Sequence, residues 1–449
     1  MQARLVERPP GAVLFRTPGG SHGEVVTAET FLRAVHRLAA VLGDSARGDG
    51  PVLNLCADRC LFALAVVASV LRGRPCVLAG ADQPGVDALA RRFPGAWAVA
   101  EQGALPVGVA GQEIALLRAD AAGPPPPNPA PPADQLVAFA LTSGSTGEPA
   151  AHPKPWGALA ARSAAAGSRF GLEEATPATI VGTVPPQHMY GFETTVMLPL
   201  HAAASSWCGP TFYPADIRAA LAAAVAPAVL VTTPLQVRAL MEGGVPLPPF
   251  AAAISATAPL DPLLAASAER AWDMPMLEIY GATEAGSLAS RRTVESEAWL
   301  PYPGVAVTEE DGTAVARAEG MAPQRLADSI EPLGDGRFRL LGRRADLVKL
   351  GGRRASLAGL TRILCGLDGV LDGAFAAPDD LERRASARLL AFAVAPERTA
   401  ESLLAELRGK VDPVFLPRRV IRVERLPRNP LGKLPREALL ALAAEGAEQ

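Results

Sequence analysis

The sequence alternates short apolar segments with longer segments of helical periodicity, and this alternation is its strongest constraint on the fold. Residues 52–56 form an apolar run, residues 60–71 a helical segment and residues 75–79 a second apolar run. A strand, a helix and a second strand in this order predict a parallel sheet with helices on its faces. The expected fold class is therefore α/β.

The same alternation continues beyond this first unit. Thr27 is expected to cap a helix whose apolar face is made by Phe31, Leu32, Val35, Leu38 and Leu42. Further strands are predicted at residues 136–141, 179–184, 229–232, 251–255 and 274–280, and helices at residues 158–166, at residues 234–241 and after Pro262.

The C-terminal part of the chain has a different character. From residue 309, short strand-like pieces follow one another with turn signals between them, and residues 342–352 form a charged segment that looks like a joint. We expect a large N-terminal domain of mixed sheets flanked by helices at residues 1–341, and a small, mobile α+β lid domain at residues 342–449. The proline-rich stretch at residues 123–132 is expected to be stiff and extended. It is either a domain boundary or a surface loop.

Composition excludes several classes of partner. The formal net charge is −3, which gives no basic footprint for nucleic acid. The longest apolar run, residues 60–71, is well short of the roughly 20 residues that span a bilayer. The N-terminus has no apolar signal segment, so a cytoplasmic location is expected. The five cysteines contain no CxxC pair and the five histidines no HExxH motif. We expect buried, reduced thiols and no zinc or iron held by the protein.

A loop of small hydroxylated residues follows the predicted strand at residues 136–141. It reads Thr142-Ser143-Gly144-Ser145-Thr146-Gly147. Several backbone N–H groups and hydroxyls can converge there, and glycines let the backbone approach closely, so the loop can cradle phosphate oxygens. It is not a Walker A motif, because no Gly-Lys-Ser/Thr follows at the required spacing. The alternative is an ordinary polar turn.

Other polar segments end predicted strands, at residues 186–188, 255–259 and 280–284. Ligands collect at the carboxyl ends of strands in such sheets, so these tips can share one crevice. In the last of them, the Tyr280 ring can stack on a base, the Thr283 hydroxyl can hold a phosphate and Glu284 can hold Mg²⁺. The alternative is a core tyrosine and a glutamate that caps a helix.

Single residues elsewhere each have a plain structural alternative. Asp328 can hold ribose hydroxyls or be an exposed turn residue. Arg343 can hold ribose or phosphate, or form a solvated surface pair. Lys433 lies on a turn near the C-terminus, where a lysine is normally exposed. His188, beside Tyr190 and Gly191, is either part of a site or a buried, satisfied histidine.

These motifs, in this order, resemble the adenylate-forming superfamily of acyl-CoA synthetases, peptide-synthetase adenylation domains and luciferases. The resemblance covers nearly the whole chain. It implies an ATP and AMP site made by Thr142, Ser143, Gly144, Ser145, Thr146, Gly147, Thr257, Ala258, Pro259, Tyr280, Gly281, Asp328 and Arg343. It implies catalytic roles for His188, Thr283, Glu284 and Lys433, with Glu284 as the metal ligand. It also implies an acid pocket near His188, Tyr190, Gly191 and Gly281, and a hinge at Ala345–Asp346.

The chain departs from the superfamily pattern at three places. The phosphate loop usually continues with Pro-Lys, whereas this chain has Pro149-Ala150 and its nearest lysine is Lys154. The hinge aspartate is displaced by one position, because Ala345 stands where it is expected. Asp328 follows Leu326-Ala327 rather than the usual Thr-Gly.

The segments at residues 185–193 and 342–346 further resemble the short ligases of xanthomonadin and aryl-polyene pigment clusters. That resemblance implies an aromatic acid substrate, 4-hydroxybenzoate, and ATP and Mg²⁺ as cofactors. The acceptor would be CoA or the phosphopantetheine of a separate acyl carrier protein. Three alternatives stay open: a ligase for aliphatic or 3-hydroxy acids, a ligase with a different nucleophile as acceptor, and a nucleotide-binding homologue without catalysis.

Overall fold

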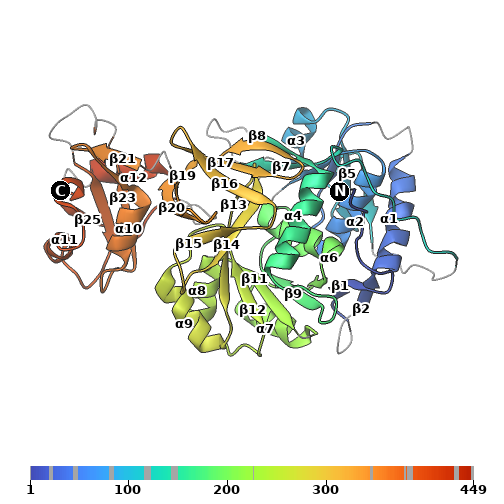
Figure 1. Cartoon of the computed structure of the whole chain (residues 1–449), viewed down its shortest axis with the longest axis horizontal. Coiled ribbons are helices and arrows are strands. Elements are labelled where there is room, and N and C mark those ends of the chain that lie inside the picture. The colour runs from blue at the N-terminus through green and yellow to red at the C-terminus, as the bar shows by residue number, and fades with distance from the viewer. Residues whose placement is uncertain are drawn as a thin grey trace. The chain divides into compact units, whose positions relative to one another are not determined.

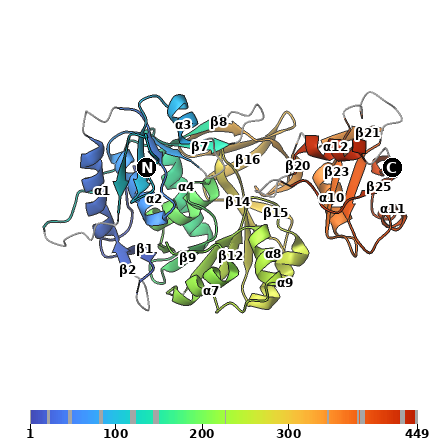
Figure 2. The same ribbon diagram turned by 180° about the vertical axis from the view of Figure 1, so that it is seen from behind.

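The computed structural model describes residues 2–19, 24–43, 49–79, 85–115, 123–142, 150–225, 227–343, 347–378, 381, 388–428 and 434–445. The chain separates into two units (Figures 1 and 2). The large unit comprises Met1–Val307, Val315–Gln324 and Gly334–Arg337. The small unit comprises Thr308–Ala314, Arg325–Leu333 and Phe338–Gln449. The domain boundary expected at residues 341 and 342 stays a prediction.

The first sheet of the large unit has six strands in the order β6-β5-β3-β4-β7-β8. They are β3 (Val52–Asn54), β4 (Cys76–Leu78), β5 (Trp97–Glu101), β6 (Gly111–Ile114), β7 (Leu136–Thr142) and β8 (Ala150–Pro155). All neighbours are parallel except β7 and β8, which are antiparallel. Because β3 and β4 are parallel and α2 (Arg59–Leu71) lies between them in the chain, the predicted strand–helix–strand unit is confirmed.

Helices cover both faces of this sheet. The helices α1 (Ala28–Leu42), α2 and α4 (Trp156–Arg169) contribute to one core cluster with β4, β5 and β7. On the opposite face, α3 (Val86–Arg92) packs through Leu89. The predicted cap of α1 is confirmed, since the Thr27 side chain accepts a hydrogen bond from the Thr30 amide.

The second sheet of the large unit runs β15-β14-β13-β12-β11-β9-β10-β1-β2. Its central strands β9 (Ala178–Gly182), β10 (Ala204–Trp207), β11 (Ala228–Thr232), β12 (Ala252–Ser255) and β13 (Met276–Ala282) are parallel, as is β1 (Val13–Thr17). The strands β2 (Glu24–Thr27), β14 (Gly286–Arg292) and β15 (Ala298–Pro301) are antiparallel to their neighbours. The sheet is mixed, as the sequence predicted.

Three helices pack on one face of the second sheet: α7 (Pro214–Ala223), α8 (Pro234–Glu242) and α9 (Pro262–Trp272). Each has proline in its first turn, where the missing N–H costs no hydrogen bond. The predicted helices at residues 234–241 and after Pro262 are therefore confirmed.

A helical stretch between the sheets was not predicted. It consists of α5 (Met189–Phe192), the π-helix η2 (Glu193–Met197) and α6 (Leu198–His201). Every residue from Gly191 to His201 is buried, so the sequence shows no amphipathic period. π-Helical turns are rare and occur frequently at functional sites.

The small unit is α+β. The segment that contributes to both units contains β16 (Val305–Glu310), β17 (Thr313–Ala318) and β18 (Met321–Arg325). Two antiparallel pairs follow: β19 (Asp328–Pro332) with β20 (Phe338–Arg343), and β21 (Leu347–Leu350) with β22 (Arg353–Ser356). A sheet of β23 (Asp372–Ala376), β24 (Leu390–Val394) and β25 (Val420–Arg422) packs with α10 (Leu357–Cys365) and α11 (Ala400–Leu407). The 3₁₀ turn η4 (Pro413–Phe415) and α12 (Arg436–Glu445) complete the unit.

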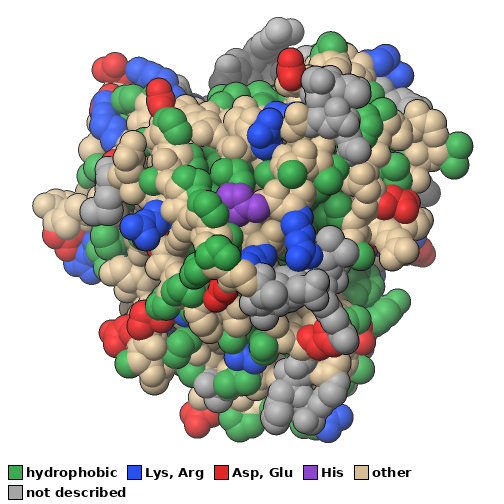
Figure 3. All heavy atoms as spheres, turned by 90° about the vertical axis from the view of Figure 1, so that its right-hand side faces the viewer, with side chains coloured by type: hydrophobic (Ala, Val, Ile, Leu, Met, Phe, Trp, Pro, Cys, Tyr) green, Lys and Arg blue, Asp and Glu red, His purple; other side chains and the backbone are tan. Residues whose placement is uncertain are grey.

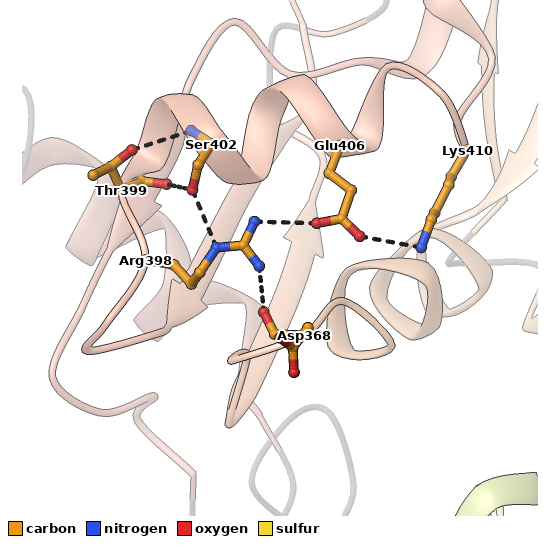
Figure 4. A network of polar contacts seen from close by, with 6 residues as sticks. All are labelled: Asp368, Arg398, Thr399, Ser402, Glu406 and Lys410. Carbon is orange, nitrogen blue, oxygen red and sulfur yellow. Dashed lines mark hydrogen bonds and ion pairs between the residues drawn. The ribbon is translucent and has the colours of Figure 1, made fainter.

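A polar network ties the two ends of α11 to the turn after α10 (Figure 4). The Arg398 guanidinium donates to Ser402 Oγ at 3.2 Å, to Glu406 Oε2 at 3.1 Å and to the Asp368 carbonyl oxygen at 2.5 Å. Lys410 Nζ donates to Glu406 Oε1 at 3.3 Å. These side chains are partly exposed, so water and salt screen the charges.

Three of the five cysteines are buried as expected, and two are not. All five are free thiols, and Cys56, Cys60 and Cys76 are buried as predicted. Cys208 is half-buried, and Cys365, the last residue of α10, is exposed. Within the residues that the structure describes, no helix has the length and apolarity needed to cross a bilayer.

Candidate active site

The predicted phosphate loop connects the two antiparallel strands β7 and β8. Thr142, the last residue of β7, pairs in register with Ala150, the first residue of β8. Ser143, Gly144, Ser145, Thr146 and Gly147 lie outside the described residues, so their predicted roles stay predictions. The Thr142 hydroxyl is hydrogen-bonded to His152 Nε2 at 3.0 Å, and burial lowers the pKa of His152. A histidine on the returning strand thus contacts the first residue of the predicted loop.

The Tyr280–Glu284 motif ends β13 and turns into β14. Tyr280 is 8% exposed and its ring packs on Trp299 with centroids 5.6 Å apart. Gly281 lies at a β-bulge, and a Cβ there would overlap the Gly286 carbonyl oxygen, so only glycine fits. Thr283 and Glu284 form the turn, and both are half-buried. The structure therefore places the predicted phosphate and metal residues together at one strand tip.

Lys154, for which no role was predicted, reaches this turn from β8. It is 5% exposed, and its Nζ donates to the Thr283 carbonyl oxygen at 2.5 Å and to the Glu284 carbonyl oxygen at 2.9 Å. Burial lowers the pKa of the Lys154 ammonium to about 8, while the charges of Glu193 and Glu284 oppose the shift. The strand that leaves the predicted phosphate loop is thereby hydrogen-bonded to the predicted metal-binding turn.

Glu193 holds the far end of the same turn from η2. Its carboxylate accepts hydrogen bonds from the Ser287 amide at 2.9 Å and from the Ser287 hydroxyl. Glu193 is 7% exposed, and burial raises its pKa, while Ser287, Arg162 and Lys154 oppose the rise. This role of Glu193 was not predicted, because the residue lies in the helical stretch that the sequence analysis missed.

Three of the four predicted acid-pocket residues lie at the start of α5, and the fourth, Gly281, lies on β13. His188 precedes α5 and is half-buried. The Tyr190 hydroxyl donates to the Ile254 carbonyl oxygen at 2.7 Å. A Cβ on Gly191 would overlap the Pro185 carbonyl oxygen, which explains the glycine at this position. The turn before α5 is thus packed closely against the first turn of the helix.

Arg59, another residue without a predicted role, fixes the entry to this turn. It is buried at the start of α2, and its guanidinium donates to the carbonyl oxygens of Gly182 and Val184. The segment between β9 and His188 is therefore anchored to the first sheet's helices.

The segment expected beside the adenine follows β12. Thr257 has φ of +79°, in the left-handed region that a β-branched residue rarely adopts. Strained backbone of this kind clusters at functional sites. Thr257, Ala258 and Pro259 are exposed, and the segment is held at its end, where the Leu260 amide donates to Glu278 Oε1 at 2.8 Å.

Two residues predicted to bind the nucleotide lie opposite each other on neighbouring strands of the small unit. Asp328 begins β19 and lies opposite Arg343, the last residue of β20. The Arg343 side chain, Ala345, Asp346 and Lys433 lie outside the described residues, so their predicted roles stay predictions. Gly342 has φ of +110°, and a side chain there would collide with Ser356 Oγ.

The donor set fits a magnesium ion at Glu284. Within the described part of the chain, its carboxylate forms no hydrogen bond or ion pair, and no cluster of three or more ligating side chains occurs. Mg²⁺ is commonly held by one or two carboxylates with substrate phosphates and water supplying the other ligands. A carboxylate that has no hydrogen bond or ion pair among the described residues, in a turn hydrogen-bonded to the strand that leaves the predicted phosphate loop, meets that requirement.

Comparison with known proteins identifies the family. The model of the family described as AMP-binding enzyme matches residues 86–319. The chain belongs to this family. The predictions of an adenylate-forming superfamily member and of an enzyme are thereby confirmed.

Two curated relatives carry the same name. The chain is 30% identical to 4-coumarate–CoA ligase of Rhodobacter capsulatus over 271 residues. That alignment covers 60% of this chain and 66% of the relative. It is also 30% identical to 4-coumarate–CoA ligase of Halorhodospira halophila over 310 residues. That alignment covers 65% of this chain and 73% of the relative. The aligned parts therefore span about two thirds to three quarters of these relatives.

Solved structures establish the fold over the whole chain. ATP-bound MatB from Rhodopseudomonas palustris matches with a TM-score of 0.78 at 20% identity, covering 99% of this chain and 98% of that chain. O-succinylbenzoate-CoA synthetase from Bacillus subtilis in complex with AMP matches with a TM-score of 0.78 at 17% identity and covers 95% of both chains. The predicted α/β fold, with a large N-terminal and a small C-terminal domain, is confirmed.

Proposed function

We propose that this enzyme activates a small aromatic carboxylic acid with ATP through an acyl-adenylate and transfers the acyl group to a thiol. The expected acid is 4-hydroxybenzoate, and the acceptor is CoA or the phosphopantetheine of a separate acyl carrier protein. The family membership and two relatives named 4-coumarate–CoA ligase support an aryl-acid ligase. The observation that carries the proposal is the hydrogen-bonded junction between β8, which leaves the predicted phosphate loop, and the Thr283–Glu284 turn.

The first half-reaction joins the acid to AMP. A carboxylate oxygen of the acid attacks the α-phosphorus of ATP, the bond to the β-phosphate oxygen breaks, and pyrophosphate leaves. Negative charge gathers around the phosphorus, so fixed donors and cations accelerate the step. Thr142 and the hydroxyls and amides of residues 143–147 would donate to phosphate oxygens, and Lys433 would bridge the acid and the α-phosphate. Glu284 would hold Mg²⁺, which supplies charge neutralisation at the phosphates.

The second half-reaction passes the acyl group to sulfur. A thiolate attacks the carbonyl carbon of the adenylate, AMP leaves as the carbon–oxygen bond breaks, and the thiol proton goes to solvent. We assign Lys433 to the first step, in a mobile domain of residues 342–449. Ala345–Asp346 would absorb the rotation of that domain between the two steps.

The acid would bind near His188, Tyr190, Gly191 and Gly281. Gly191 cannot carry a side chain, because a Cβ there would overlap the Pro185 carbonyl oxygen. A histidine and a tyrosine at this position suit a short aromatic acid better than a long aliphatic chain. Asp328 and Arg343 would hold the ribose, and Tyr280 with Thr257, Ala258 and Pro259 would flank the adenine.

The face in Figure 3 shows described Lys and Arg side chains interspersed with Asp, Glu and hydrophobic ones. ATP–pyrophosphate exchange reports only the first half-reaction, so CoA and a carrier protein's phosphopantetheine are to be compared as acceptors in a separate thioester-forming assay.

ATP–pyrophosphate exchange with a panel of acids tests the proposal. The panel contains 4-hydroxybenzoate, 3-hydroxybenzoate, cinnamate, octanoate and a 3-hydroxy fatty acid. Exchange that is strongest with 4-hydroxybenzoate is expected. Exchange only with the aliphatic acids would keep adenylation and overturn the aromatic substrate. No exchange with any acid would favour a nucleotide-binding homologue without catalysis, with Ala150 and Ala345 as the first positions to examine.

A further inference from the structure

A buried lysine and a buried glutamate form hydrogen bonds to backbone groups at the turn between β13 and β14. Lys154 approaches from β8 and is 5% exposed, and Glu193 approaches from η2 and is 7% exposed. Lys154 belongs to no motif that the resemblance identified, and Glu193 ends the segment at residues 185–193 without having been assigned a role. Each is distant in sequence from the turn: Lys154 is separated from Thr283 by 129 positions and Glu193 from Ser287 by 94.

The side-chain hydrogen bonds of Lys154 go to this turn, and those of Glu193 go to Ser287, the second residue of β14. Strand pairing ends at the Ala282–Gly286 pair, so the carbonyl groups of Thr283 and Glu284 lie beyond the β-ladder. Lys154 Nζ donates to both of them. Glu193 accepts from the Ser287 amide and hydroxyl on the other side of the turn. Buried backbone groups need such partners, so the two side chains define where the turn lies.

Burying these charges is costly, which argues against a packing role alone. An apolar side chain of similar volume in place of a buried ion is often neutral or stabilising. Arg162 on α4, also buried, acts electrostatically on Glu193, and Glu284 and His152 face Lys154 from the turn and from β8. Lys154 and Glu193 are thus linked electrostatically to Arg162, His152 and Glu284, and only Glu284 among these five has a side chain assigned to a ligand.

We propose that Lys154 and Glu193 are positioning residues that hold the Thr283–Ser287 turn in the geometry in which Glu284 binds the magnesium of Mg·ATP. The inference rests on the proposed function for the identity of the ligand. Lys154 fixes the carbonyl groups of Thr283 and Glu284. Glu193 fixes Ser287, where the chain continues into β14. The Glu284 carboxylate is thereby left for the metal, because the lysine bonds to its backbone rather than to its side chain.

Lys154→Met tests the inference, because methionine keeps the length and apolar stem but has no donor. Loss of an outer partner of a metal ligand commonly weakens metal affinity by roughly 10- to 100-fold. We expect the Mg²⁺ concentration for half-maximal pyrophosphate exchange to rise at least about 10-fold, with the KM of the acid unchanged. Lys410→Met, the same change at an exposed lysine, is the matched control and should leave the Mg²⁺ dependence as in wild type.

Two binding measurements make the test independent of turnover. Calorimetric titration with ATP should show weaker binding for Lys154→Met in the presence of Mg²⁺ and unchanged binding with EDTA. Hydrogen exchange in the ligand-free protein should be faster in a peptide that covers residues 281–288. Wild-type Mg²⁺ dependence and wild-type exchange in Lys154→Met would overturn the inference. An inactive wild type that still binds Mg·ATP would overturn the proposed function alone.

Ser287→Ala keeps the inference testable if Lys154→Met does not fold. It removes only the hydroxyl hydrogen bond to Glu193 and keeps the amide bond. A smaller shift of the Mg²⁺ dependence in the same direction is expected. An unchanged Mg²⁺ dependence in a folded Ser287→Ala protein, together with unchanged hydrogen exchange at residues 281–288, would count against the role of Glu193.

Discussion

Lysine and glutamate side chains have different surroundings and different partners in the two units of the molecule. In the large unit, Lys154 and Glu193 are buried and bond to backbone groups and to a serine. In the small unit, Lys410 is 49% exposed and pairs directly with Glu406, which also receives Arg398. A buried charge must find hydrogen-bond partners and thereby fixes main-chain geometry. An exposed pair competes with water, so either member can be replaced at little cost.

The largest effect on stability is expected for Glu193→Ala. It leaves the buried cations Lys154 and Arg162 without their shared counter-charge and removes both acceptors of Ser287. Leaving a buried donor without its acceptor typically costs about 1–3 kcal/mol, and the loss of a counter-charge near two buried cations adds to this cost. Urea unfolding should show a lower midpoint for Glu193→Ala and a smaller loss for Glu193→Gln, which keeps an acceptor. A loss for Glu193→Ala no larger than that for Glu406→Gln would break the comparison between the units.

The next largest effect is kinetic and comes from the small domain. Lys433→Ala is expected to slow adenylation by roughly 10²–10³-fold, the scale for losing one partner of transition-state charge. Transfer from preformed acyl-adenylate to the thiol should be spared. Single-turnover assays of each half-reaction measure both steps, with Lys410→Ala as a second lysine of the same unit. Equal slowing of both half-reactions by Lys433→Ala would contradict the assigned step.

The strands and helices were predictable where one residue's neighbours in sequence decide its structure. Thr27 caps α1, and prolines open α8 and α9, because caps and first turns are local features. The helical stretch from α5 to α6 was missed because it is buried on all sides. Without a polar face, its sequence carries no 3.6-residue period.

The motifs at strand tips were also predictable, whereas the residues that hold them were not. The Thr283–Glu284 turn was found from its own sequence and from the order of motifs around it. Lys154 and Glu193 act on that turn from other elements, and nothing near either residue in sequence indicates the contact. Lys154 was noted only as the lysine nearest the phosphate loop, and its bond to the turn depends on how β8 packs in three dimensions.

The smallest effect is expected for Glu406→Gln in the small unit. Hydrogen bonds from Arg398 and Lys410 hold the pKa of Glu406 below its ordinary value. A carboxyl group whose pKa is lowered by folding stabilises the protein above its unfolded pKa, and this contribution is lost as pH falls through the lower, folded value. Wild type and Glu406→Gln should therefore differ slightly in thermal midpoint at neutral pH and converge in acid. Because the pair is exposed, 1 M salt should also reduce the difference. A difference that persisted in high salt and in acid would show that packing of α11, rather than the exposed charges, sets the contribution of this network.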